Sequence, residues 1–206
     1  LFLSLHRAAR PLLAPTAADI AEALGGRRDT EHLTILYARG GAAARTMDFF
    51  ARDAEFRYRQ LVTALGGPPA GDGRVTVFLF ESADEKRRWL GAAHVQVAKP
   101  WRREVYVQWD ALPHPVLAHE LAHVFAGRFG DSIFGVARRG LAFNVGLIEG
   151  VAVAAGEHPV AGAPLLDHQV KAMRDLGLEP GFDAVFGLGF LGEAPARAYT
   201  VAGSFI

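Results

Sequence analysis

The sequence predicts an α+β fold, in which a small mixed sheet packs on a helix and a mainly helical part follows. Two observations predict the sheet: strand-like apolar runs occupy residues 33–37 and 75–80. Another predicts helices, because apolar residues recur at spacings of three and four over 42–65, and apolar segments of helical length cover 116–125 and 144–153. No internal repeat is visible.

Composition limits the class of protein. A chain of 206 residues, half of them hydrophobic and 21% charged, is long enough for one globular domain with a proper core. It has 22 basic and 22 acidic side chains, so the formal net charge is zero and we expect no nucleic-acid partner. It has no cysteine, which excludes disulfides and cysteine-ligated metal sites.

We expect a separate N-terminal segment over residues 1–30, followed by one domain over 31–206. The apolar start, Leu1 to Leu5, is too short to span a bilayer and is either the remnant of a signal or anchor segment or an ordinary element. A capping box from Thr16 to Asp19 begins a short helix that ends at Gly25-Gly26. Because residues 204–206 fall within an apolar helical pattern, we expect the domain to be truncated at its C-terminus.

The scaffold then follows in order. The strand over 33–37 precedes the amphipathic helix over 42–65, which Gly66-Gly67-Pro68 ends. The run over 75–80 is nearly all apolar, as in a central strand that is covered on both faces. Ser82 caps another helix.

A hairpin is expected next, with strands over 95–97 and 105–108 joined around Lys99-Pro100-Trp101. The stretch 103–109 lies directly before the helix of residues 116–125, so it is our candidate for the edge strand beside that helix. An edge strand could pair with an extended peptide. A purely structural role is the alternative.

The chemistry of the chain is concentrated in His119, Glu120 and His123, which form an HExxH motif. On a helix, residues four apart lie on one face, so the two imidazoles can bind one Zn²⁺. Glu120 then lies beside the metal, where it can take a proton from an activated water. The motif predicts a zinc hydrolase, and among these a peptidase. The alternative is a core helix whose histidines hydrogen-bond internally, but a glutamate between two buried histidines would be costly without a metal or partner.

The third metal ligand is expected to be Glu149. It lies in an otherwise apolar helix over 144–153 with Asn144 as N-cap, and a lone carboxylate there needs a partner. Asp131 is the second choice, although it follows Gly130 in an expected loop. A solvent-facing or loop position for Glu149 remains the alternative. His32 and the remaining histidines have no ligand spacing to the motif.

These residues resemble a known group. The HELAH sequence followed by Glu149-Gly150-Val151-Ala152 is similar to the gluzincin branch of the MA clan of metallopeptidases, and most of all to the bacterial peptidase MA-like domain, a relative of the aminopeptidase N catalytic domain. The resemblance covers residues 31–206. It implies a zincin-like fold, one zinc ion per chain, a peptide or protein substrate and, together with the apolar start of the chain, a bacterial cell-envelope or secreted location. Segments that flank these residues could associate the protein with a membrane. The resemblance also implies that Tyr199, in the helix over 198–206, stabilises the oxyanion of the tetrahedral intermediate.

The chain departs from the family in three places. Leu147-Ile148 replaces the aromatic and small residues that often precede the third ligand. The stretch between His123 and Glu149 is longer than in aminopeptidases and rich in glycine, which suggests a mobile loop over the cleft. The Gly-x-Met-Glu-Asn signature of aminopeptidases is absent, so aminopeptidase specificity is not expected.

Two other classes of function stay open. One is a zinc-binding but inactive domain that recognises a peptide, although such a domain has no use for the base Glu120. The other is a non-proteolytic zinc hydrolase. A metal-free structural domain is the remaining reading.

Overall fold

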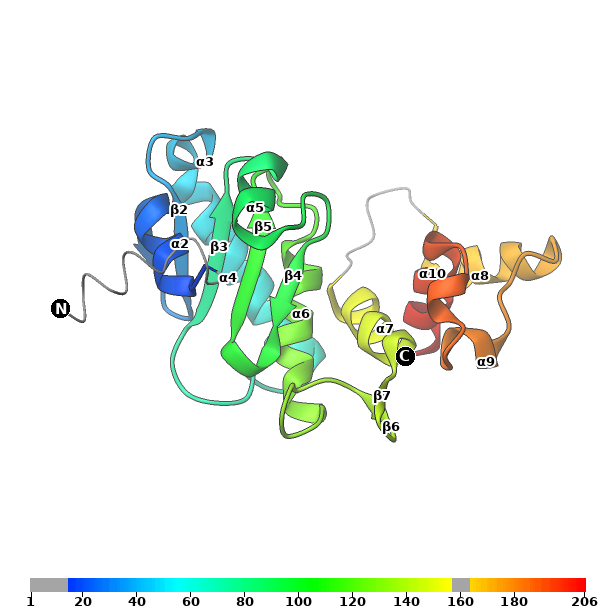
Figure 1. The fold of residues 1–206 in the computed structure, drawn as a ribbon. Coiled ribbons are helices and arrows are strands. Elements are labelled where there is room, and N and C mark those ends of the chain that lie inside the picture. The colour runs from blue at the N-terminus through cyan, green and yellow to red at the C-terminus, as the bar shows by residue number, and fades with distance from the viewer. Residues whose placement is uncertain (1–14, 157–163) are drawn as a thin grey trace.

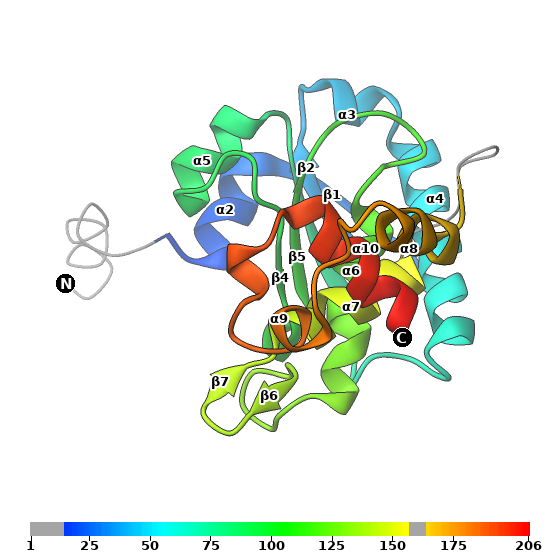
Figure 2. The same ribbon diagram turned by 90° about the vertical axis from the view of Figure 1, so that its right-hand side faces the viewer.

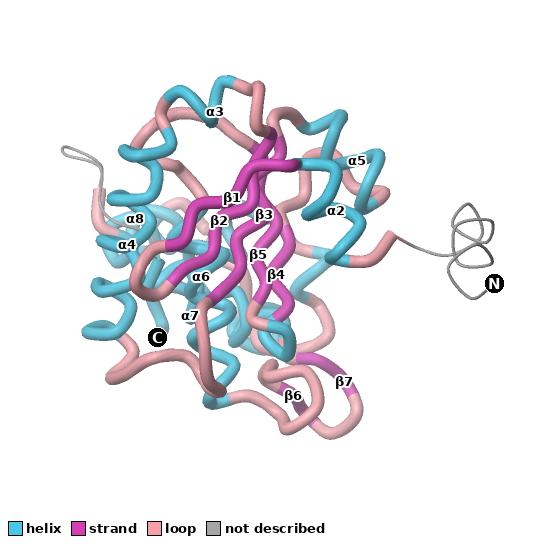
Figure 3. The backbone as a smooth tube through the Cα atoms, turned by 90° about the vertical axis from the view of Figure 1, so that its left-hand side faces the viewer, coloured by secondary structure: helices cyan, strands magenta, loops and turns pink. Residues whose placement is uncertain are grey.

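A five-stranded mixed sheet organises the first part of the chain (Figures 1 and 3). The computed structural model describes residues 15–156 and 164–206. The strands are β1 (Gly25–Asp29), β2 (Leu33–Ala38), β3 (Val75–Phe80), β4 (Val97–Lys99) and β5 (Glu104–Gln108), in the order β1-β2-β3-β5-β4. The three inner strands run parallel, and both edge strands pair antiparallel with their neighbours. The predicted mixed sheet is therefore confirmed.

Alternate residues of the central strand β3 face opposite layers. Val77 and Leu79 enter the main core, whereas Phe78 and Phe80 enter a second core on the other face. All four are buried, as the continuous apolar run predicts for a strand that is covered on both sides.

Helix α4 (Met47–Ala64) covers one face of the sheet together with α6 (Leu117–Ala126). The single helix predicted over 42–65 is wrong, because Thr46, with φ −118° and ψ 15°, separates α4 from a short α3 (Ala42–Arg45). The apolar spacing runs through this break because both pieces bury side chains in the same core.

The opposite face is covered by α2 (Ala17–Leu24) and α5 (Ala83–Leu90). The predicted capping box of α2 is confirmed: Thr16 accepts a hydrogen bond from the Asp19 amide, and Asp19 accepts one from Thr16. Gly25 adopts φ 69° as the C-cap, and β1 starts at this residue. Leu1 to Leu5 lie outside the described residues.

The edge strand next to α6 is β4 and not the predicted stretch 103–109. That stretch forms β5, which pairs with β3 on one side and with β4 on the other. The hairpin itself is confirmed, with its first strand two residues later than expected and a 3₁₀ turn, η2 (Pro100–Arg102), before β5. The outer edge of β4 is the part of the sheet that faces the C-terminal half.

The rest of the chain is mainly helical, as predicted. It contains η3 (Gly127–Phe129), a small hairpin of β6 (Arg138–Arg139) and β7 (Ala142–Phe143), α7 (Val145–Gly156), α8 (Leu166–Asp175), α9 (Phe182–Val185), η4 (Phe190–Gly192) and α10 (Pro195–Phe205). In Figure 2 these helices lie in front of the sheet, with α7 next to α6 and α10 next to α7. Among the described residues, no helix combines the length and apolar character needed to cross a bilayer.

Candidate metal centre

Helix α6 places the HExxH residues at the boundary between the sheet and the C-terminal helices. Leu117, Leu121 and Phe125 are fully buried against the sheet and α4, which fixes how the helix is rotated. This rotation puts His119 and His123 on the side that faces α7, with ring centroids 4.9 Å apart and nearly perpendicular rings.

Helix α7 brings the predicted third ligand to the same point. Asn144 caps the helix, as predicted, because its side-chain oxygen accepts a 3.0 Å hydrogen bond from the Leu147 amide. Glu149, one turn further on, points at both imidazoles: its Oε2 lies 3.3 Å from His119 Nε2 and 3.6 Å from His123 Nε2. The structure thus brings together three residues that are up to 30 positions apart in the sequence.

Close helix packing holds α7 in this position. A Cβ atom on Gly150 would lie 2.7 Å from the backbone oxygen of Ala202 in α10, and one on Gly156 would lie 2.7 Å from the backbone of His119. Only glycine lets the backbones approach this closely. The two glycines therefore set the spacing between the helices that carry the candidate ligands.

The protonation states suit a cation. Burial lowers the pKa of His123 to about 4, so its imidazole is neutral at pH 7, the form that binds metals. Burial alone would raise the pKa of Glu149, but its interactions with His119, His123 and Tyr199 lower it below the ordinary value, so this side chain is a carboxylate.

Glu120 differs from Glu149. It is 7% exposed, and its pKa is raised to about 7, chiefly by burial and further by the charge of Glu149, while His119 and Lys86 lower it. A carboxyl group with a pKa close to neutral can both accept and return a proton. Ligand-type atoms of His119, Glu120 and His123 lie within 4.8 Å of one another, so Glu120 lies next to the imidazoles.

Tyr199 lies on α10 over the same site. Its ring is roughly parallel to that of His119, with a 6.3 Å separation of centroids, and its hydroxyl interacts with the Glu149 carboxylate. Burial and Glu149 raise its pKa to about 12, so the hydroxyl keeps its proton and can donate a hydrogen bond at neutral pH.

These residues line a cleft of about 710 Å³. One wall is the edge strand β4 with the residues before it, followed by Pro100 and Trp101 of η2. The floor is α6, and α7 closes the far side through Leu147, Ile148 and Val151. The cleft thus has an unpaired strand edge along one side and the imidazoles at its base.

One polar pair beside the cleft was missed by the sequence analysis. Lys86 of α5 is fully buried and donates a 2.6 Å hydrogen bond to the side chain of Gln96, which lines the cleft just before β4. Burial lowers the pKa of Lys86, and the charge of Glu120 opposes that shift. A lysine in an amphipathic helix gives no signal that it will be buried, so only the fold reveals this pair.

Asp131, the second choice for the third ligand, has a structural role. Its carboxylate accepts hydrogen bonds from the amides of Ile133, Phe134 and Val136, so it organises the turn after η3. These hydrogen bonds, the Phe134 amide first among them, lower its pKa. The stretch expected as a glycine-rich loop therefore contains an ordered turn and the β6–β7 hairpin.

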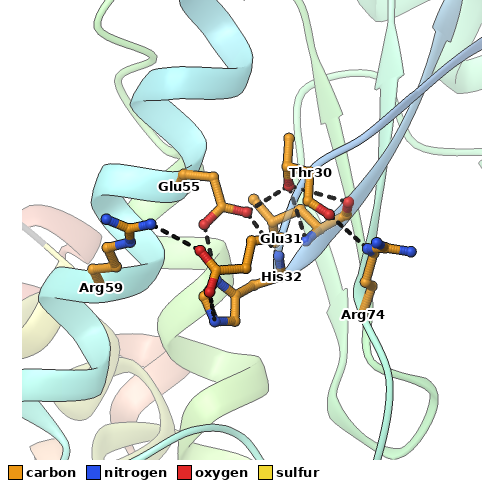
Figure 4. A network of polar contacts seen from close by, with 7 residues as sticks. Thr30, Glu31, His32, Glu55, Arg59 and Arg74 are labelled. Carbon is orange, nitrogen blue, oxygen red and sulfur yellow. Dashed lines mark hydrogen bonds and ion pairs between the residues drawn. The ribbon is translucent and has the colours of Figure 1, made fainter.

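A second cluster of histidine and glutamate lies on the far side of α4 (Figure 4). Glu55 accepts hydrogen bonds from the Thr30 hydroxyl and from the His32 backbone amide, and His32 Nδ1 lies 2.9 Å from its other oxygen. Glu31 is 2.9 Å from the guanidinium of Arg59. His32 had no ligand spacing to the motif, and it lies in this separate cluster. His6 and His158 lie outside the described residues.

Comparison with protein-family models gives no match for this chain, and comparison with curated proteins gives none either.

Proposed function

We propose that this chain is a zinc-dependent peptidase with a zincin-like fold, in which His119, His123 and Glu149 hold one zinc ion. The observation that carries the proposal is the position of the Glu149 oxygen, 3.3 and 3.6 Å from the two Nε2 atoms. Ligand atoms bound tetrahedrally to zinc at about 2.0–2.1 Å are separated by roughly 3.3 Å. The two distances from Glu149 to the imidazole nitrogens are therefore close to the separation between ligands of one zinc ion.

The charges of the site support the same assignment. Two histidines and one glutamate are a known ligand set for catalytic zinc, which keeps a further position open. The carboxylate of Glu149 and the neutral imidazole of His123 are the forms that bind a metal. When bound, the zinc ion supplies Lewis acidity at a scissile carbonyl and makes water a stronger nucleophile at neutral pH.

The protein side chains then supply the proton transfers and a hydrogen bond. Glu120 accepts the proton of the attacking water and returns it to the leaving amine, for which its raised pKa is suited. Tyr199 donates its hydroxyl proton in a hydrogen bond to the developing oxyanion. The outer edge of β4 pairs with the extended backbone of the substrate, as an added strand would.

The lining of the cleft favours apolar segments of a peptide. Among the described residues that line it, the charged side chains are the two glutamates of the centre, and the others are apolar or uncharged. A free C-terminal carboxylate in such a cleft would lie near these two glutamates with no opposite charge among the described lining side chains, which is unfavourable. We therefore propose cleavage of apolar stretches away from the C-terminus of a peptide or protein.

Metal content tests the proposal first. The purified chain should hold one zinc by native mass spectrometry, Glu149→Ala should lose it, and Glu55→Ala, a matched change in the second cluster, should keep it. Zinc retained by Glu149→Ala would place the third ligand elsewhere. A zinc-free wild type after reconstitution would contradict the metal centre itself.

Activity then separates the peptidase from the other classes. A library of unstructured peptides should be cleaved at bonds within apolar segments, and addition of a chelator should abolish the cleavage. A protein that binds zinc and peptides but cleaves none would be the inactive recognition domain, and cleavage of esters or amides alone would indicate a non-proteolytic hydrolase.

A further inference from the structure

A group of exposed apolar side chains surrounds one end of the cleft. We call it the hairpin patch. Its members are Trp101, Phe129, Ile133, Phe134, Leu141 and Phe143. They come from η2, from η3 and the turn after it, and from the β6–β7 hairpin. Large apolar residues exposed together on one surface mark sites of interaction.

The patch is ordered by contacts between its rings. Phe134 packs edge-on against Trp101, with centroids 5.5 Å apart, and against Phe143, with centroids 5.9 Å apart. These contacts connect η2 to the hairpin across the turn that Asp131 organises. The exposed rings are therefore held as one surface.

Part of the patch lies on a projecting hairpin. The β6–β7 hairpin projects from the body of the protein in all three overall views (Figures 1, 2 and 3). Leu141, in the turn of the hairpin, is 94% exposed. A projecting hairpin with two-residue strands offers little of the roughly 800 Å² per partner that a stable protein interface buries. It is small enough to enter the headgroup region of a lipid bilayer.

The charge of the patch is positive. The chain as a whole has no net charge, yet residues 127–143 contain three arginines and one aspartate. Arg128 lies over the ring of Phe129 at 5.0 Å. Arg138 lies over that of Phe143 at 5.9 Å and also forms a 3.8 Å ion pair with Asp131, which leaves the segment with a net positive charge. Cationic groups thus lie at the same level as the exposed rings, the arrangement that suits the headgroup layer of a membrane with anionic lipids.

We propose that the hairpin patch docks this protein on the surface of an anionic lipid bilayer. Leu141 and the phenylalanines enter the boundary between headgroups and acyl chains, Trp101 lies at headgroup level, and Arg128 and Arg138 pair with lipid phosphates. Because Trp101 and Phe129 also line the cleft, docking holds the cleft entrance at the lipid surface. The inference does not depend on the peptidase proposal, since it uses no residue of the metal centre.

Flotation of the whole chain with vesicles tests the proposal. The chain should bind vesicles made of equal parts phosphatidylglycerol and phosphatidylcholine, bind phosphatidylcholine vesicles much more weakly, and lose binding as salt is raised. The double variant Leu141→Ser/Phe143→Ser should bind the anionic vesicles at least about tenfold more weakly, because two exposed apolar side chains are removed. Arg138→Gln should weaken binding roughly fivefold.

The matched control is Leu176→Ser/Leu188→Ser, which removes two exposed leucines far from the hairpin in the sequence. It should bind like the wild type, and all variants should keep the wild-type circular dichroism and zinc content. Absence of binding, equal binding to both lipids, or equal loss in the control would overturn the proposal. Self-association that the Leu141→Ser/Phe143→Ser variant abolishes in sedimentation velocity would also overturn it, because the patch would then bind a second copy of the chain.

Discussion

The two histidine–glutamate clusters use the same residue types and differ in what their carboxylates already bind. At the first, the Glu149 oxygen faces two ring nitrogens from the neighbouring helix, in a cleft. At the second, Glu55 is occupied by the Thr30 hydroxyl, the His32 amide and the His32 ring (Figure 4). The first cluster brings two ring nitrogens and a carboxylate oxygen together in a cleft, where the Tyr199 hydroxyl also contacts the carboxylate. The second cluster does not line that cleft and is held by donors from Thr30 and His32.

The first cluster is therefore the candidate metal site, and the second has a structural role. In the second cluster, Arg59 lies 2.9 Å from Glu31 and brings a positive charge to the carboxylate that a metal would need. The His32 ring is also stacked on Tyr58, with centroids 4.3 Å apart, so it is fixed between α4 and the β1–β2 turn. Proximity of histidine and glutamate is therefore a weak criterion, and convergence of two imidazoles and a carboxylate in a cleft, without a competing cation, is a better one.

The largest difference between the clusters is expected when the proposed proton acceptor, Glu120, is replaced. Glu120→Gln keeps the size of the side chain and removes the proposed base, so peptide hydrolysis should fall by roughly 10²–10⁴-fold while zinc content is unchanged. The measurement is kcat on a cleaved peptide, with zinc determined in the same sample. Wild-type turnover in this variant would exclude Glu120 as the base.

The corresponding change in the second cluster is Glu55→Gln. Hydrolysis should stay at the wild-type rate, because Glu55 does not line the cleft. Unfolding by urea should show a loss of about 1–3 kcal/mol, since donors from Thr30 and His32 lose a charged acceptor. A loss of hydrolysis without a loss of stability would reverse the assignment of the two clusters.

Each cluster also has a tyrosine stacked on its histidine. Removing each hydroxyl in turn compares the roles of the two tyrosines. Tyr199→Phe should lower kcat about 100-fold with little change in KM, because in the proposed mechanism its hydroxyl stabilises the transition state. Tyr58→Phe, beside His32, should leave kcat unchanged. Equal kcat in Tyr199→Phe and the wild type would remove Tyr199 from the mechanism.

The sequence predicted the parts of the centre whose signals are local. Asn144 as the cap of α7, and the apolar faces of α6 and α7 around polar residues, are visible in short windows. The convergence of Glu149 with the two histidines could be expected only because a lone carboxylate in an apolar helix needs a partner.

What the sequence did not predict depends on pairing and burial. Strand β1, Gly25–Asp29, has no apolar character and exists through its backbone pairing with β2. The edge position of β4 follows from the parallel pairing of β5 with β3, which sequence order does not specify. The second cluster joins residues 23 and more positions apart, and each of them alone resembles an ordinary surface polar residue.

The first cluster depends on the close contact of α7 with α10, and the second does not. A substitution at Gly150 tests this difference. In Gly150→Ala, the new methyl group meets the backbone of α10 at 2.7 Å, and this overpacking should cost about 1–3 kcal/mol. The gain in helix propensity, up to about 1 kcal/mol, offsets only part of it.

Gly192→Ala is the control, because a Cβ there meets nothing within 4 Å. Gly150→Ala should lower the melting temperature and zinc affinity together, whereas Gly192→Ala should change neither. Unchanged zinc affinity in Gly150→Ala would mean that α7 and α10 can separate without moving Glu149.

The last difference between the clusters is their response to acid in the zinc-free protein. Hydrogen bonds from Thr30 and His32 outweigh burial and lower the pKa of Glu55, so its stabilisation is present above the unfolded pKa and is lost as the pH falls through the folded one. Burial raises the pKa of Glu120 from 4.5 to about 7, so its contribution is present below pH 4.5 and is lost as the pH rises toward 7. Urea unfolding with a chelator present measures both effects as differences in the free energy of unfolding. Relative to Glu55→Gln, the wild type should become less stable as the pH falls. Relative to Glu120→Gln, it should become less stable as the pH rises from 4.5 to 7. Parallel pH profiles for the two variants would mean that both carboxylates have the same kind of environment. The distinction between a structural cluster and a candidate metal centre would then be wrong.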